Sequence, residues 1–172
     1  MAAADTADPL VHPYLTTAGL LVEAHAGFVA RLEAALLQHC DLSSQWFDVL
    51  IRLARTPGHR LRMSDLAAQT ILTASGLTRS VDRLEAAGLV RREACPSDRR
   101  GAYAVLTPEG EARIAAAVPV HVAELRTIFD ELYTPAEVDA LTELLRRLRG
   151  ALNPGAARAS LPCSEGEPDA PA

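Results

Sequence analysis

Residues 66–112 read LAAQTILTASGLTRSVDRLEAAGLVRREACPSDRRGAYAVLTPEGEA, and the first half of this stretch predicts two short helices. The first is expected over residues 64–70 and the second over residues 73–87, with Ser64 and Thr73 as their N-caps. The second helix carries small polar residues and arginine, and a tight turn joins it to the first. This combination is typical of a helix-turn-helix.

A β-hairpin is predicted directly after these helices. Gly88 can adopt the left-handed conformation that ends a helix, and strand-like runs follow over residues 89–94 and 102–107. Residues 95–101 between them contain turn formers and charge, so we expect a connection longer than a two-residue turn. The hairpin would project from the two helices as a wing.

Longer helices are expected on both sides of this unit. Apolar residues at helical spacing predict one helix over residues 14–39, and N-cap signals start others at Ser43, Thr107 and Thr134. The predicted fold class is therefore mainly α with a small β-wing. One domain is expected over residues 13–153, between a flexible arm at residues 1–12 and a disordered tail at residues 154–172.

The charge of the chain is unevenly distributed. The 172 residues carry a formal net charge of −5, which by itself argues against nucleic acid. Residues 52–100, however, hold ten arginines and five acidic residues, so this segment carries +5 and the rest of the chain −10. Such a division indicates one basic working face on an acidic body.

Several classes of protein are excluded by the sequence. No apolar run approaches the ~20 residues of a membrane span, and the acidic N-terminus does not resemble a secretory signal. The three cysteines, Cys40, Cys95 and Cys163, suit a reducing cytoplasm, and neither Cys40 nor Cys95 has surroundings typical of a redox sensor. We expect no metal or cofactor and no enzymatic activity, because ligand spacings and catalytic motifs are missing.

The ordered set of motifs in residues 66–112 resembles the core of MarR-family transcriptional regulators. The motifs are Asp82-Arg83-Leu84-Glu85, Gly88-Leu89-Val90, Asp98-Arg99-Arg100 and Leu106-Thr107-Pro108-Glu109-Gly110. The resemblance extends over about residues 14–152 and implies a homodimer on a pseudo-palindromic operator in double-stranded DNA. Residues 13–42 and 108–153 would then dimerise, and residues 43–107 would form the winged helix-turn-helix.

The second helix of the pair is the predicted recognition helix. Its first turns offer small residues that permit close approach to a groove, and arginines that can contact guanine or phosphate. The candidates are Thr73, Ser75, Gly76, Thr78, Arg79 and Arg83. Arg79 could instead be a phosphate clamp, and Arg83 could pair with Asp82 or Glu85. Leu77, Val81 and Leu84 are predicted to be core.

The wing supplies the other predicted DNA contacts. The resemblance implies that Arg100 enters the minor groove, where narrow A·T tracts attract arginine, and that Asp98 orients its guanidinium. Arg99 is expected at phosphate. The alternative is an ordinary solvated turn of charged residues.

The resemblance also implies release from DNA by an aromatic or phenolic ligand, bound between the dimer helices and the DNA-binding lobe. His25, Phe28, Trp46 and Phe47 are the candidates for this pocket, although each could be plain core. The sequence thus predicts a cytoplasmic DNA-binding transcriptional regulator, in the role of a dimeric repressor. The alternative is a ligand-binding or protein-interaction dimer that does not bind DNA.

Overall fold

A computed structural model describes residues 9–70, 72–95 and 98–155 of the chain. Its elements in chain order are a 3-10 helix Pro9–Val11, α1 Pro13–Cys40, α2 Ser44–Ala54, a 3-10 helix Pro57–His59, β1 Arg60–Arg62, α3 Met63–Gln69, α4 Ala74–Ala86, β2 Val90–Cys95, β3 Asp98–Leu106, α5 Pro108–Leu132 and α6 Pro135–Leu152. This is the predicted mainly α fold with a small sheet. The expected tail lies outside the described residues except for Pro154 and Gly155, as do residues 1–8 of the expected arm.

Side-chain caps start four of the helices where the sequence predicts them. Ser43, Thr73 and Thr107 accept hydrogen bonds from backbone N–H groups in the first turns of α2, α4 and α5. Thr134 and Glu137 form a reciprocal capping box at α6. The prediction for Ser64 is wrong: α3 begins at Met63, so Ser64 lies inside the helix, and its hydroxyl donates to Asp65 Oδ1 at 3.3 Å.

The three strands form one antiparallel sheet in the order β1-β3-β2. The wing strands are longer than predicted, because pairing continues to Cys95 and Asp98 after a register shift at Ala94. The expected seven-residue connection is therefore wrong, since only residues 96 and 97 separate the strands. Strand β3 includes the charged residues 98–100, of which Asp98 pairs with Cys95, although the composition of this segment is typical of a turn.

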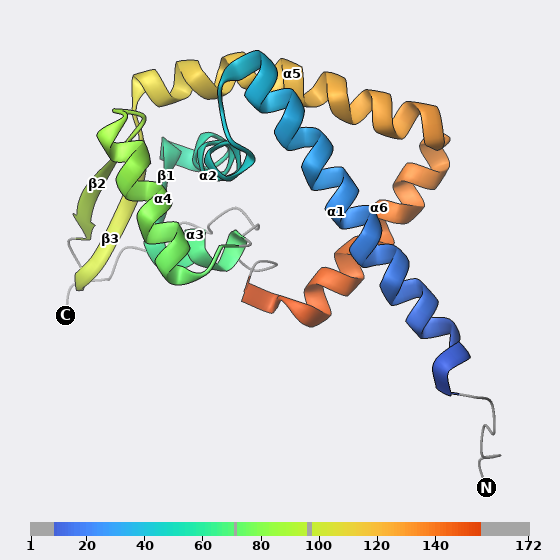
Figure 1. The fold of residues 1–172 in the computed structure, drawn as a ribbon. Helices are drawn as coiled ribbons and strands as arrows, with labels where there is room; N and C mark the ends of the chain where they lie inside the picture. Colours follow the sequence, from blue (N-terminus) through green and yellow to red (C-terminus); the bar gives the residue numbers. More distant parts are fainter. Residues whose placement is uncertain (1–8, 71, 96–97, 156–172) are drawn as a thin grey trace, which may run out of the picture.

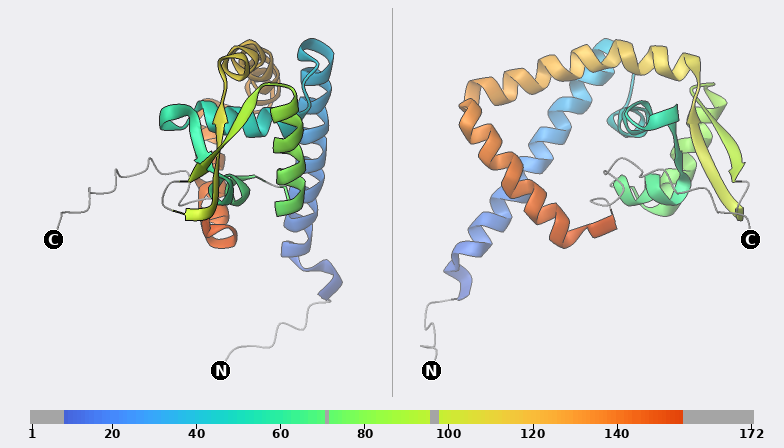
Figure 2. Two further views of the ribbon diagram at one scale, coloured as in Figure 1. Left: turned by 90° about the vertical axis from the view of Figure 1, so that its left-hand side faces the viewer. Right: turned by 180° about the vertical axis from the view of Figure 1, so that it is seen from behind.

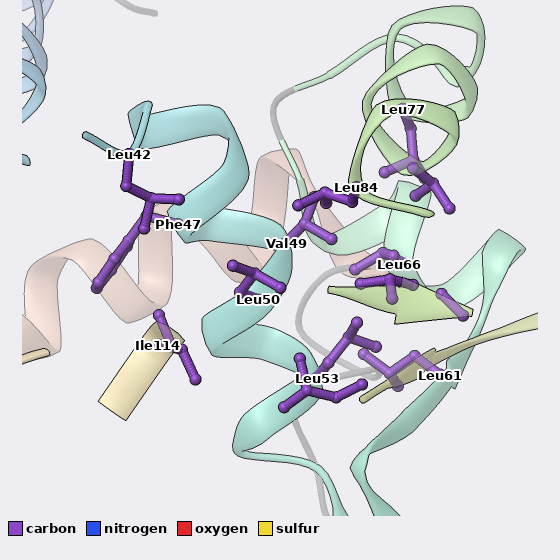
Figure 3. Packing of buried hydrophobic residues seen from close by; sticks show 14 of the residues in the cluster. Leu42, Phe47, Val49, Leu50, Leu53, Leu61, Leu66, Leu77, Leu84 and Ile114 are labelled. Atoms are coloured by element: carbon purple, nitrogen blue, oxygen red, sulfur yellow. The ribbon is translucent and has the colours of Figure 1, made fainter. Parts of the chain in front are cut away.

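Helix α2 forms the centre of the hydrophobic core (Figure 3). Val49, Leu50 and Leu53 are fully buried. Around them pack residues from every other part of the winged lobe and from α5, including Leu66, Leu77, Leu84, Val90 and Ile114. Because one core holds α2, α3, α4 and the sheet together, the lobe is a rigid platform.

The helices α1, α5 and α6 extend well beyond this lobe (Figure 1). The winged lobe lies under the N-terminal end of α5, while α1 descends from the middle of α5 toward the N-terminus. Helices α1 and α6 overlap in Figure 1 but are separated in the side view of Figure 2. No helix in the described part of the chain is long and apolar enough to cross a membrane.

Candidate nucleic-acid interface

Helix α4 has one buried and one exposed face. Leu77, Val81 and Leu84 are buried, as predicted, together with the hydroxyl of Ser80. The predicted contact residues are on the outside: all of them are exposed except the half-buried Gly76, and they comprise Thr73, Ser75, Thr78, Arg79 and Arg83. The structure therefore places these six candidates along the N-terminal and outer surface of one helix.

Local hydrogen bonds hold the polar side chains at the start of α4. The Thr73 hydroxyl oxygen accepts from the Gly76 N–H at 3.1 Å and lies 3.3 Å from the Ser75 hydroxyl oxygen. The Thr78 hydroxyl donates to the Ala74 carbonyl at 2.9 Å. Such hydroxyls keep lone pairs that can still accept hydrogen bonds, so this end of the helix is polar and small in profile.

The two arginines of α4, Arg79 and Arg83, differ in their salt bridges from Arg91 and Arg92 of the neighbouring strand β2. Within the described residues, no carboxylate forms a salt bridge with Arg79 or Arg83. Arg83 forms no salt bridge with Asp82 or Glu85, and Arg92 of β2 binds both acids, at 2.7 and 2.8 Å. Arg91, next to Arg92, pairs instead with Glu93. Both guanidinium groups on α4 are thus available to an external anion.

The predicted wing residues Asp98, Arg99 and Arg100 lie at the start of β3. Asp98 is the register partner of Cys95, so its backbone is at the end of the hairpin distant from α5. The side chains of residues 98–100 are outside the described part of the structure. Their predicted roles therefore rest on sequence.

A second pair of arginines lies at the β1 edge of the sheet. The guanidinium carbons of Arg60 and Arg62 on β1 lie 5.2 and 5.7 Å from the ring centroid of Tyr103 on β3. The hydrogen bond with Tyr103 is the largest cause of the raised pKa of Arg62. The two arginines share one face of the sheet, as their two-residue spacing predicts, and cation–π contact holds them against it.

A cavity of about 680 Å³ lies where α1, α2 and α5 meet. Of the four candidates for an effector pocket, His25, Phe28 and Phe47 line this cavity. Trp46 does not: it packs against the hydrophobic core. Neighbouring residues on a helix point about 100° apart, so Trp46 and Phe47 face different surroundings. Arg52 and Arg55 also line the cavity, where Arg52 pairs with Asp48 at 2.8 Å.

His121 of α5 is a cavity residue that the sequence reasoning missed. Its ring stacks on Phe47 with 4.2 Å between centroids, and its Nδ1 is buried with no partner among the described residues. Burial lowers the pKa of His121. The signal was present in the helical spacing, since Ile114, Ala117 and His121 fall on one face of α5. The His121 ring lines the cavity, while its Nδ1 is covered by the surrounding protein.

Cysteines and metal ligands give no site in the described chain. Cys40 is half-buried and Cys95 is buried, neither forms a disulfide in the described part of the chain, and Cys163 lies outside it. Among residues 9–70, 72–95 and 98–155, no group of three or more His, Cys, Asp or Glu side chains is arranged to hold a metal ion.

Comparisons with known proteins agree with this geometry. The MarR family model matches residues 41–101. An uncharacterized HTH-type transcriptional regulator of Bacillus cereus is 30% identical over 118 residues, which cover 69% of this chain and 77% of the relative. The crystal structure of Sco3205, a MarR family regulator from Streptomyces coelicolor in complex with DNA, is 33% identical with a TM-score of 0.75, covering 91% of this chain and 93% of Sco3205.

A further similar structure is that of BpsR from Bordetella bronchiseptica, whose DNA binding is regulated by 6-hydroxynicotinic acid. It is 26% identical with a TM-score of 0.68, over 77% of this chain and 98% of BpsR. The winged-helix fold, the motif set and these similarities point to the same family. The chain belongs to the MarR family of transcriptional regulators, which are not enzymes.

Proposed function

We propose that this protein is a homodimeric, cytoplasmic repressor that binds a pseudo-palindromic operator in double-stranded DNA. A small aromatic or phenolic ligand in the cavity would release it. The observation that carries the proposal is the outer face of α4, where Arg79 and Arg83 are exposed and no described carboxylate neutralises them. A planar guanidinium at this position can bind guanine O6 and N7 together. The DNA complex of Sco3205 gives further support.

The proposed dimer is supported by apolar surface that a single chain leaves in water. Helix α6 buries none of its residues, and Leu144, Leu145, Leu148 and Leu152 are each at least 41% exposed. The N-terminal half of α1 exposes Tyr14, Leu15, Leu20, Leu21 and Val22 in the same way. Exposed apolar surface of this extent is typical of a protein interface. A second copy that covers them would set two α4 helices on half-sites about one turn of DNA, roughly 34–36 Å, apart.

The effector proposal is supported by the chemistry of the cavity. Phe28 and Phe47 offer aromatic walls, the His121 ring stacks on Phe47, and Arg55 lines the cavity without a salt bridge in the described chain. These groups match a planar ring that bears a carboxylate or hydroxyl. The cavity joins α1 and α5 to α2, so a ligand there can alter how the lobe sits on the long helices.

Selection from random duplexes, followed by affinity measurements against salt, tests the function. We expect enrichment of a palindromic motif and a steep linear fall of log affinity with log salt, because bound phosphates release counterions. No enrichment and a flat salt response would leave the alternative of a dimer that does not bind DNA. Titration of the complex with hydroxylated aromatic carboxylates, 6-hydroxynicotinic acid included, tests the effector separately.

A further inference from the structure

Arg92 of the wing binds three groups along one side of α4. Its Nη1 donates to Asp82 Oδ1 at 2.7 Å and to Glu85 Oε2 at 2.8 Å, and its Nη2 donates to the Thr78 carbonyl at 3.3 Å. Thr78, Asp82 and Glu85 are four and three residues apart, so they form one stripe on the helix. The guanidinium thus lies against two full turns of the predicted recognition helix.

We call the contacts of Arg92 with Thr78, Asp82 and Glu85 the Arg92 joint. Glu85 makes two contacts in it. Its Oε1 accepts the backbone N–H of Arg92 at 2.8 Å, while its Oε2 binds the Arg92 side chain. One carboxylate therefore fixes both the strand backbone and the guanidinium. Burial lowers the pKa of Arg92, but the hydrogen bonds to Asp82 and Glu85 together outweigh this effect and the pKa is raised. Only 27% of the Arg92 side chain is exposed.

The joint has two consequences for DNA. First, the donors of Arg92 that point at α4 are already used, so Arg92 is poorly placed to bind phosphate itself. Second, Asp82 and Glu85 would otherwise place two carboxylates on the helix that approaches the negatively charged duplex, or would capture Arg83. With Arg92 bound to both acids, their charge is partly compensated and Arg83 remains available.

We propose that Arg92 is a positioning residue for operator recognition, which sets the angle between α4 and the wing and keeps Asp82 and Glu85 from opposing the DNA. The proposal rests on the proposed function, because it assumes that α4 and the wing engage one duplex together. It predicts that loss of the joint lowers affinity for the operator more than affinity for unrelated DNA, since only the operator complex needs both elements in register.

The test compares Arg92→Gln in two backgrounds, wild type and Asp82→Asn/Glu85→Gln, on the operator selected by the wild-type protein and on an unrelated duplex. We expect Arg92→Gln to weaken operator binding about tenfold or more in the wild type, and less than about threefold in the double variant. A direct phosphate contact predicts the same loss in both backgrounds, with the salt slope reduced by about one per contact. That result, or no loss in the wild type, would overturn the proposal.

Two further variants keep the test decisive. Arg91→Gln removes the same charge from the adjacent residue without changing Asp82 or Glu85. It should preserve the ratio of the affinity for the operator to the affinity for unrelated DNA.

If Arg92→Gln fails to fold, Glu85→Gln replaces it. The joint predicts weaker operator binding for Glu85→Gln, although removing a negative charge should tighten contact with DNA; tighter binding would contradict the joint. If the wild type binds no DNA, the proposed function fails first, and this outcome is visible without any variant.

Discussion

Gly110 of α5 lies against the backbone carbonyl of Leu89, so closely that a Cβ at residue 110 would be 2.0 Å from the carbonyl oxygen. The same oxygen accepts the Thr107 N–H at 3.1 Å, and the Thr107 hydroxyl donates to the Gly88 carbonyl at 2.7 Å. Thr107 and Gly110 together therefore dock the first turn of α5 on the segment that links α4 to β2. This contact connects the winged lobe to the long helices.

Gly110→Ala should destabilise the fold by about 1–3 kcal/mol or more, because the added methyl meets backbone that cannot give way. Gly27→Ala in α1 is the matched control, since a Cβ there meets nothing within 4 Å. It should be neutral or stabilise by up to about 1 kcal/mol through helix propensity. Urea unfolding of both variants measures the difference. Equal stability of the two would mean that α5 does not approach Leu89 in solution.

Arg79→Ala should weaken operator binding by about 1–3 kcal/mol and relax the preference at one base position of each half-site. The reason is the loss of a two-pronged contact to guanine from the exposed face of α4. Arg126→Ala, on the distal part of α5, removes the same charge and is the control. Affinity for operators with single base changes is the measurement. A uniform loss across all sequences would instead assign Arg79 to phosphate.

Arg100→Ala and Arg99→Ala should affect different properties of DNA binding, namely the sequence preference and the salt dependence. Loss of Arg100 should reduce the preference for A·T pairs at the flanks of the operator and leave the dimer intact, because a narrow minor groove attracts arginine. Loss of Arg99 should lower the salt slope by about one per protomer with little change in sequence preference. Binding to duplexes with A·T or G·C flanks separates the two. Unchanged affinity for Arg100→Ala would remove the wing from the mechanism.

Leu148→Glu should convert the dimer to monomers, because it places a charge in the apolar face of α6 that a second copy would cover. Affinity for the full operator should fall steeply as the two half-sites lose their linkage. Sedimentation and duplex binding measure both effects. Arg147→Glu on the same helix is the control and should remain dimeric. A Leu148→Glu protein that stays dimeric would place the interface elsewhere.

His121→Phe should make the free energy of unfolding less dependent on pH on the acidic side of neutrality. Burial lowers the pKa of His121, so the folded state binds fewer protons than the unfolded state around the ordinary histidine pKa of about 6.5. Its contribution is therefore complete above that pH and is lost as the pH falls through the lowered folded value. Thermal unfolding of wild type and variant from pH 8 to pH 5 shows this. An identical pH dependence for both proteins would contradict it.

Local chemistry made most of the fold predictable. The sequence correctly predicts the hydroxyl caps at Ser43, Thr73, Thr107 and Thr134, because a cap depends on groups within three residues. The failures came where partners are distant. Ser64 has the right chemistry for a cap, but β1 pairs with β3 as far as Arg62 and α3 begins at Met63. Strand pairing also extends the wing beyond its apolar residues.

The candidate site shows the same division. The spacing of Leu77, Val81 and Leu84 determined which face of α4 is buried, and hence that Arg79 and Arg83 are exposed, since a helix has a fixed period. Only the tertiary structure decided that Asp82 and Glu85 form salt bridges with Arg92 and not with Arg83. It also decided that His121, and not Trp46, lines the cavity with Phe47. Periodicity orients a side chain on its own element, whereas pairing depends on how separate elements pack together.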